Sequence, residues 1–229
     1  MPRLAFAALA AALLAACGGA EPRAPEDGAP LVVVLASPPG AGPDRLRAGD
    51  PAGARAAFEG VLARDPDALA ALNDLAVAYL VEGHAEPARR LLDDVVAQGG
   101  PREQQAALLN LGELYALDGY LDAAQAYLES ARGVDRERAE PWYALALLAD
   151  VRGDRAGARA LVGEAVRLDE SGAARGSLAY VYPEERVHLE ALMAERSGEY
   201  ALAVTRWREL AAGQLPGLAA VAERHLAGE

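Results

Sequence analysis

The stretch LLNLGELYALDGYLDAAQAYLESA, residues 108–131, decides the fold. Its apolar residues recur at helical spacing, and Gly119 falls where the first amphipathic run gives way to the second. Comparable runs surround Gly83, Gly153 and Gly198, so that successive glycines of this series are 36, 34 and 45 residues apart. A period near 34 residues is typical of stacked helical hairpins. The sequence therefore predicts an all-α solenoid, whose hairpins present a continuous surface to a partner.

The repeat pattern predicts the organisation of the folded part of the chain. Four fuller units are expected at about 69–100, 105–136, 139–170 and 184–215. An incomplete unit precedes them from Asp44, and the amphipathic stretch after Pro216 predicts a helix that covers the apolar end of the array. Residues 44–229 are thus expected to hold about 4.5 repeats and a capping helix.

The residues within each unit resemble the pattern of the tetratricopeptide repeat family. The second fuller unit fills nearly every position of that pattern: Leu108, Leu111, Gly112, Tyr115, Gly119, Tyr120, Ala124, Leu128 and Ala131. Trp142 provides the aromatic residue of the next unit, whereas Ala149 replaces its tyrosine and Glu190 replaces a leucine of the last unit. The resemblance implies a right-handed superhelix of helical hairpins that binds protein segments.

In that family the first helix of each hairpin lines a concave groove, and the resemblance implies which residues face it here. They are Asn73, Val77, Leu80, Leu109, Asn110, Glu113, Leu117, Tyr143, Leu147, Asp150, His188, Leu192 and Glu195. Asn73 and Asn110, the two asparagines of the chain, either pair with the backbone of an extended peptide or lie on a solvated helix face. Tyr143 either anchors a partner or packs beside Trp142. A basic clamp for a terminal carboxylate is disfavoured, because none of these positions is basic.

The N-terminus predicts export and lipid attachment. Residues 1–16 contain an apolar run that is too short to span a bilayer and is typical of a signal peptide. Leu14 to Cys17 resembles the lipobox of bacterial lipoproteins, in which the cysteine is acylated, and Cys17 is the single cysteine of the chain. Gly18 follows where an aspartate often marks retention at the inner membrane. The resemblance therefore implies residence at the outer membrane, facing the periplasm.

Residues 17–43 are expected to connect this anchor to the repeats. Positions 18–30 are rich in proline, glycine and acids, which predicts a solvated tether that reaches at most about 45 Å. Leu31 to Leu35 form a short apolar run that predicts an extended segment. It either covers the apolar end of the first hairpin, or it lies in the groove of the protein itself or pairs with a strand of a partner.

Composition and residue spacing exclude several classes of function. The formal charge is −12 and all 22 basic residues are arginine, so nucleic acid is not an expected partner. The histidines His84, His188 and His225 lie in separate units without metal-ligand spacing, and no motif for a cofactor or an enzymatic nucleophile is present. Residues 170–183 carry an insertion of 11 residues beyond the period, which is either a contact site or a longer hinge.

These features together predict a non-enzymatic scaffold, without metal or cofactor, that is lipid-anchored in the periplasm. Its groove would hold a segment of an envelope protein and help to assemble or localise an envelope complex, as pilotins do by analogy of architecture. One alternative is a subunit that positions or regulates a cell-wall or polysaccharide enzyme. Another is a structural lipoprotein that associates with copies of itself.

Overall fold

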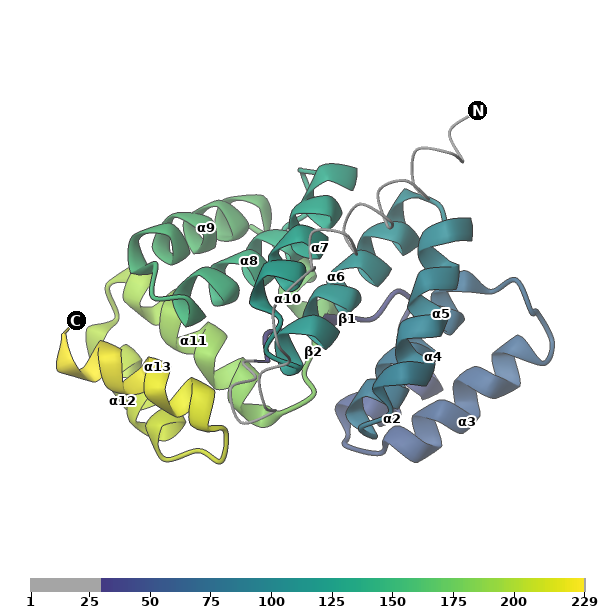
Figure 1. Cartoon of the computed structure of the whole chain (residues 1–229), viewed down its shortest axis with the longest axis horizontal. Coiled ribbons are helices and arrows are strands. Elements are labelled where there is room, and N and C mark those ends of the chain that lie inside the picture. The colour runs from purple at the N-terminus through teal and green to yellow at the C-terminus, as the bar shows by residue number, and fades with distance from the viewer. Residues whose placement is uncertain (1–29, 229) are drawn as a thin grey trace.

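The computed structural model of the protein describes residues 30–228 (Figure 1), so the predicted leader, Cys17 and residues 18–29 lie outside the described residues. Helix pairs follow one another along a curved array, from purple at the N-terminal end to yellow at the C-terminal end. The pairs are α2 (Ala41–Arg47) with α3 (Pro51–Leu62), α4 (Leu69–Val81) with α5 (Ala85–Gln98), α6 (Pro101–Leu117) with α7 (Leu121–Val134), α8 (Glu140–Val151) with α9 (Arg155–Leu168), and α11 (Pro183–Ser197) with α12 (Tyr200–Ala211). The predicted all-α solenoid is confirmed.

The turn inside each hairpin depends on a left-handed glycine. At Gly119 φ is +79°, and the amide of Tyr120 bonds back to the carbonyl of Tyr115 at 2.8 Å. Glycine adopts this conformation without the steric cost of a Cβ, and the backward bond satisfies a carbonyl at the helix end. The same φ range, +79° to +85°, recurs at the other turn glycines Gly83, Gly153 and Gly198. The periodic glycines therefore set where each first helix ends.

Small residues let the two helices of a pair approach closely. A Cβ on Gly112 would lie 2.7 Å from a methyl carbon of Leu128, so α6 and α7 meet where no larger residue fits. Near the start of the second helix, Ala88, Ala124 and Ala158 are fully buried. The small residues that recur in each unit of the sequence therefore lie where the two helices of a pair contact each other.

Both ends of the array differ from the regular pairs. The first pair is short, because α2 has seven residues and includes Pro43. At the other end α13 (Pro216–Ala227) packs on α12 and α8 through Leu218, Val221 and Ala222, as expected of a capping helix. Within residues 30–228, no helix combines the length and the hydrophobicity needed to cross a membrane.

Two short strands, one before the first helix and one in the insertion after α9, pair to form a two-stranded sheet. β1 (Val33–Val34) pairs antiparallel with β2 (Leu178–Ala179), with Val33 opposite Ala179 and Val34 opposite Leu178. β2 follows the short helix α10 (Ala173–Ser177), so the insertion at 170–183 forms structure of its own. In the view of Figure 1, β1 lies between the α4–α5 side of the array and the α8–α13 side.

Candidate protein-binding groove

Residues 31–37, here called the strap, lie in the concave groove of the same chain. Leu31 to Leu35 are between 0 and 4% exposed and belong to the same buried core as the groove side chains of α4 and α6. Burying an apolar side chain of this size contributes about 1.5–3 kcal/mol, so the five together contribute on the order of 10 kcal/mol. The groove is therefore filled in this structure.

The wall of the groove bonds to the backbone of the strap. Glu113 on α6 accepts the amide of Leu31 at 2.6 Å, and Asn110, one helical turn earlier, accepts the amide of Val34 at 2.7 Å. The side-chain amides of Asn73 and Asn110 each donate to the carbonyl of Val34 at 3.0 Å. These side chains bind backbone atoms of an extended segment, so they do not select which apolar side chains the segment carries.

The C-terminal end of the strap is held by Asp74 on α4, which the sequence analysis did not single out. Its carboxylate accepts the amides of Ala36 at 2.7 Å and Ser37 at 3.0 Å, and the side-chain amide of Asn73 at 3.0 Å. Burial raises the pKa of Asp74, and these hydrogen bonds oppose the shift. The sequence did contain a signal for this contact. Asp74 is adjacent to the predicted groove residue Asn73, and both follow an apolar run at the start of the first helix of a hairpin.

The position of the strap decides between the two interpretations of residues 31–35. It contacts α4, α6 and β2, so it does not act as a cover over the first hairpin. The side-chain amides of Asn73 and Asn110 do pair with an extended backbone, and in this structure that backbone belongs to the chain itself. Binding of a partner by these residues stays a prediction.

The remaining predicted groove residues are enclosed in this structure. Val77, Leu80, Leu109, Leu147 and Leu192 are at most 5% exposed, and Leu117 is partly buried. Tyr143 is fully buried and its hydroxyl donates to Asp169 at 3.1 Å, which places it in the packing between α8 and the end of α9. These predicted groove residues are therefore covered in this structure by the strap and by neighbouring helices.

Asp150 and His188 were predicted to face the groove but belong to a buried polar network. Asp150 bonds to the Nε2 atoms of His188 and His225, each at 2.8 Å, and is 1% exposed. Burial opposes ionisation of Asp150, yet the hydrogen bonds from both histidines hold its pKa below the ordinary value. His188 and His225 lie in separate units of the sequence, and the fold brings both to Asp150 because α11 and α13 pack against α8.

The same network extends to Glu195, another predicted groove residue. Its carboxylate bonds to Nδ1 of His225 at 2.8 Å and accepts the indole N–H of Trp207 at 2.7 Å. Burial lowers the pKa of His225, but the bonds to Asp150 and Glu195 raise it by more, so the net shift is upward. The network attaches the capping helix α13 to the array.

The insertion at 170–183 is part of the groove wall. The carbonyl of Ser177 accepts the amide of Leu35 at 3.4 Å, next to the pairing of β1 with β2. Asp169 holds the start of α10 by accepting the amides of Ala174 at 2.9 Å and Arg175 at 3.1 Å. This segment closes the groove over the strap.

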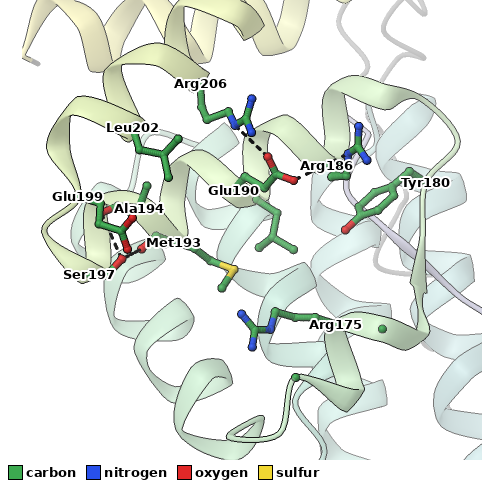
Figure 2. A pocket seen from close by; sticks show the side chains of 13 residues that line it. Arg175, Tyr180, Arg186, Glu190, Met193, Ala194, Ser197, Glu199, Leu202 and Arg206 are labelled. Carbon is green, nitrogen blue, oxygen red and sulfur yellow. Dashed lines mark hydrogen bonds and ion pairs between the residues drawn. The ribbon is translucent and has the colours of Figure 1, made fainter.

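A shallow hollow of about 620 Å³ lies outside the groove, between α10, α11 and α12 (Figure 2). Arg175, Arg186 and Arg206 reach its rim, and Met193 lies on its floor. Glu190 bonds to Arg206 at 2.9 Å and lies 3.9 Å from Arg186, so these charges are already paired. Among residues 30–228, no group of three or more potential ligands is arranged to hold a metal.

The comparison with known families agrees with this geometry. Residues 45–112 match the sequence model of the tetratricopeptide repeat. This part of the chain therefore carries tetratricopeptide repeats. The matched residues run from α2 into α6 and include most of the polar wall, Asn73, Asp74 and Asn110. No curated protein sequence matches the chain.

Solved structures resemble this chain in fold. A thermophilic TPR protein from Thermus thermophilus is 24% identical, covers 81% of this chain and 95% of its own, and superposes with a TM-score of 0.56. Two crystal structures of MamA are each 20% identical and cover 84% and 82% of this chain and 100% and 92% of their own, with TM-scores of 0.44 and 0.42. The tetratricopeptide fold is that of a protein–protein interaction scaffold, and proteins of this family are generally non-enzymatic.

Proposed function

We propose that this protein is a lipid-anchored adaptor of the bacterial cell envelope that binds an extended apolar segment of an envelope protein in its concave groove. The strap occupies the place of that segment when no partner is bound. One observation carries the proposal: the polar wall contacts the strap through backbone atoms, and such a wall accepts any strand of suitable composition.

The geometry defines what such a segment must contain. The amides that correspond to Leu31, Val34 and Ala36 donate to side chains, so proline is excluded at these positions. The side chains between them enter a fully buried environment, so a charged residue there would lose its hydration without a partner. The expected ligand is therefore a run of about five aliphatic residues in β conformation.

Exchange of the strap for a partner strand is energetically feasible because the two make the same contacts. A partner of similar composition regains the burial and the hydrogen bonds that the strap loses, so the net cost is that of association and of freeing residues 31–37. The segment Ser37 to Gly40, which connects the strap to α2, is partly or fully exposed and can act as the hinge. Displacement then needs no rearrangement of the helix pairs.

A labelled peptide tests this proposal directly. A rhodamine-labelled copy of residues 30–37, with two lysines added for solubility, is titrated into the full chain while fluorescence anisotropy is measured. We expect saturable binding, and we expect a peptide with proline at the position of Val34 to bind at least about tenfold more weakly, since it lacks the amide that Asn110 accepts. Absence of binding by the unaltered peptide would refute exchange.

A disulfide lock provides the matched control. Val34 and Leu178 are directly opposite in the β1–β2 pair, where Cα atoms lie about 4.5–5.5 Å apart, within the range that a disulfide bridges. In a Cys17→Ser background, the Val34→Cys, Leu178→Cys protein should bind the peptide when reduced and lose binding when oxidised. Equal binding in both forms would place the peptide on another surface.

The lipid anchor needs a separate test, because it rests on the sequence alone. Cells that express the full chain are fed an alkyne-tagged fatty acid, and the tag is detected on the purified protein. We expect labelling of the unaltered chain and none of the Cys17→Ser variant, with the labelled protein in the outer-membrane fraction. Equal labelling of both would exclude Cys17 as the attachment site, and recovery in the inner-membrane fraction would contradict the proposed location.

A further inference from the structure

Two buried carboxylates lie at the N-terminal end of the strap. Glu113 on α6 accepts the amide of Leu31, and Glu185 at the start of α11 accepts the amides of Val181 at 3.0 Å and Tyr182 at 2.8 Å. Both glutamates are 0% exposed. Pro30, which directly precedes the strap, and residues 181–182 line the same small hollow of about 200 Å³. The two acids thus hold two segments that meet at the mouth of the groove.

Among residues 30–228, no positive charge balances the charges of Glu113 and Glu185. Oε1 of Glu113 is buried without a hydrogen-bond partner. Within residues 30–228, neither carboxylate forms a hydrogen bond or an ion pair with an arginine or a histidine. The charge of Glu113 acts on Glu185, and two buried anions that interact in this way repel each other. Proteins commonly relieve such repulsion by retaining a proton.

Among the described residues, the neighbouring elements supply no compensating positive charge. On α11, Glu184 adds to the negative potential at Glu185, and Arg186 is exposed and lies 3.9 Å from Glu190. Burial raises the pKa of the Tyr180 phenol beside β2 to about 12, so it also stays neutral in mildly alkaline solution. On α4, Asp74 lies at the other end of the strap, where it binds Ala36 and Ser37. The strap itself carries no ionisable side chain, and the charged residues of α5 and α7 are exposed or half-buried on the outer side of α6.

We propose that Glu113 and Glu185 retain one proton between them and that its loss loosens the N-terminal end of the strap, so that proton concentration controls access to the groove. This inference rests on the proposed function and describes its regulation. With the proton present, the orphan oxygen of Glu113 can act as a hydroxyl donor and the pair carries a single charge. Without it, two charges face each other beside Leu31, and separating the strap from α6 lets water reach them.

The direction of the titration agrees with a proton held at neutral pH. Burial raises the pKa of Glu113 to about 8, and burial together with the charge of Glu113 raises the pKa of Glu185 well above its ordinary value. The N-terminal end of the strap should therefore be held against α6 below pH 7 and should separate from it more readily in mildly alkaline solution. We call this pH-dependent contact the latch.

The peptide titration at two pH values tests the latch. The probe here is a rhodamine-labelled copy of residues 33–37, which does not reach Glu113, so that the charge of the pair acts on the strap and not on the peptide. For the unaltered full chain we expect this peptide to bind at least tenfold more tightly at pH 9 than at pH 6, because its competitor is loosened. Glu113→Gln keeps an acceptor for the amide of Leu31 and removes the ionisation, so its affinity should not change with pH. Glu223→Gln, on the exposed face of α13, is the matched control and should keep the full pH dependence. Binding that is independent of pH in the unaltered chain would overturn the latch while leaving the proposed function intact.

A measurement without peptide separates the two proposals. Amide hydrogen exchange of Leu31 and Val32, corrected for the intrinsic effect of pH, should accelerate at least tenfold between pH 6 and pH 9 in the unaltered chain, and Glu113→Gln should abolish the change. This result would support the latch even if the peptide fails to bind at either pH, in which case the proposed function alone is refuted. Carbon NMR of the glutamate carboxyls that shows both groups fully ionised at pH 6 would overturn the latch.

Discussion

Asn110 holds the centre of the strap, so Asn110→Ala should weaken that contact measurably. The replacement removes three hydrogen bonds: the acceptor for the amide of Val34, one of two donors to the carbonyl of Val34, and the donor to Asn73. The carbonyl keeps its bond from Asn73, but the buried amide of Val34 loses its acceptor. An unsatisfied buried donor costs about 1–3 kcal/mol and a lost neutral hydrogen bond about 1 kcal/mol. We expect a loss of about 2–4 kcal/mol.

Hydrogen exchange at the amide of Val34 measures this loss at the place where it arises. Because each 1.4 kcal/mol corresponds to a factor of ten, the expected change is an acceleration of about 30- to 700-fold. Urea unfolding followed by circular dichroism should show a lower midpoint with unchanged helicity in water. Gln125→Ala on the exposed face of α7, which removes a bond to Arg152, is the matched control and should stay within about 0.5 kcal/mol.

The reasoning fails if Asn110→Ala exchanges the Val34 amide at the original rate and costs less than about 0.5 kcal/mol. A double-mutant cycle with Asn73→Ala sharpens the test, because both amides donate to the same carbonyl. The two changes should be non-additive by about 0.5–3 kcal/mol. Strict additivity would mean that the two asparagines act independently of each other and do not share the carbonyl of Val34.

Three further perturbations follow from the packing and the buried charges. Gly112→Ala places a Cβ 2.7 Å from Leu128 and should cost about 1–3 kcal/mol in urea unfolding, whereas an unchanged midpoint would show that α6 and α7 separate freely. Asp150→Ala leaves two buried histidines without their hydrogen-bond partner and should lower the free energy of unfolding by about 3–5 kcal/mol. This loss corresponds to a fall in Tm of roughly 6–20 °C, and a shift smaller than about 2 °C would contradict a structural role for the network. Glu113 binds its proton more tightly in the folded protein than in the unfolded chain. The free energy of unfolding should therefore fall as pH rises from the ordinary pKa of 4.5 to about 8, and this fall should be shallower in Glu113→Gln. Parallel pH profiles for the two proteins would refute this.

The helical array was predictable because its determinants are local and periodic. A glycine with positive φ recurs after each first helix, and small residues recur where the second helix returns, so each hairpin could be located without knowledge of the others. Gly112 illustrates the point, since its absent side chain defines the contact with Leu128. The polar wall was partly predictable for the same reason, because Asn110 and Glu113 lie one turn apart on the inner face of α6.

What the sequence left open depends on contacts between distant segments. Leu31 meets Glu113 across 82 residues and His225 meets Asp150 across 75, and no periodic pattern links either pair. Five consecutive apolar residues are equally compatible with a cover over a helix end and with a strand in a groove, since periodicity does not distinguish them. The residue that decides between them is Asp74, which is visible as a ligand of the strap only when α4 and residues 36–37 are placed together.

The location of the strap gives the proposed anchor a mechanical consequence. If Cys17 carries lipid, the strap lies between the membrane attachment and the first helix pair, so its release adds residues 31–37 to the tether. Seven extended residues span about 23–25 Å, which is more than half of the roughly 45 Å available from residues 18–30 alone. Binding of a partner strand would therefore free the groove of its own chain and let the array stand further from the membrane in the same step. This coupling requires both that Cys17 is acylated and that the side chains of Asp74, Asn110 and Glu113 release the strap backbone.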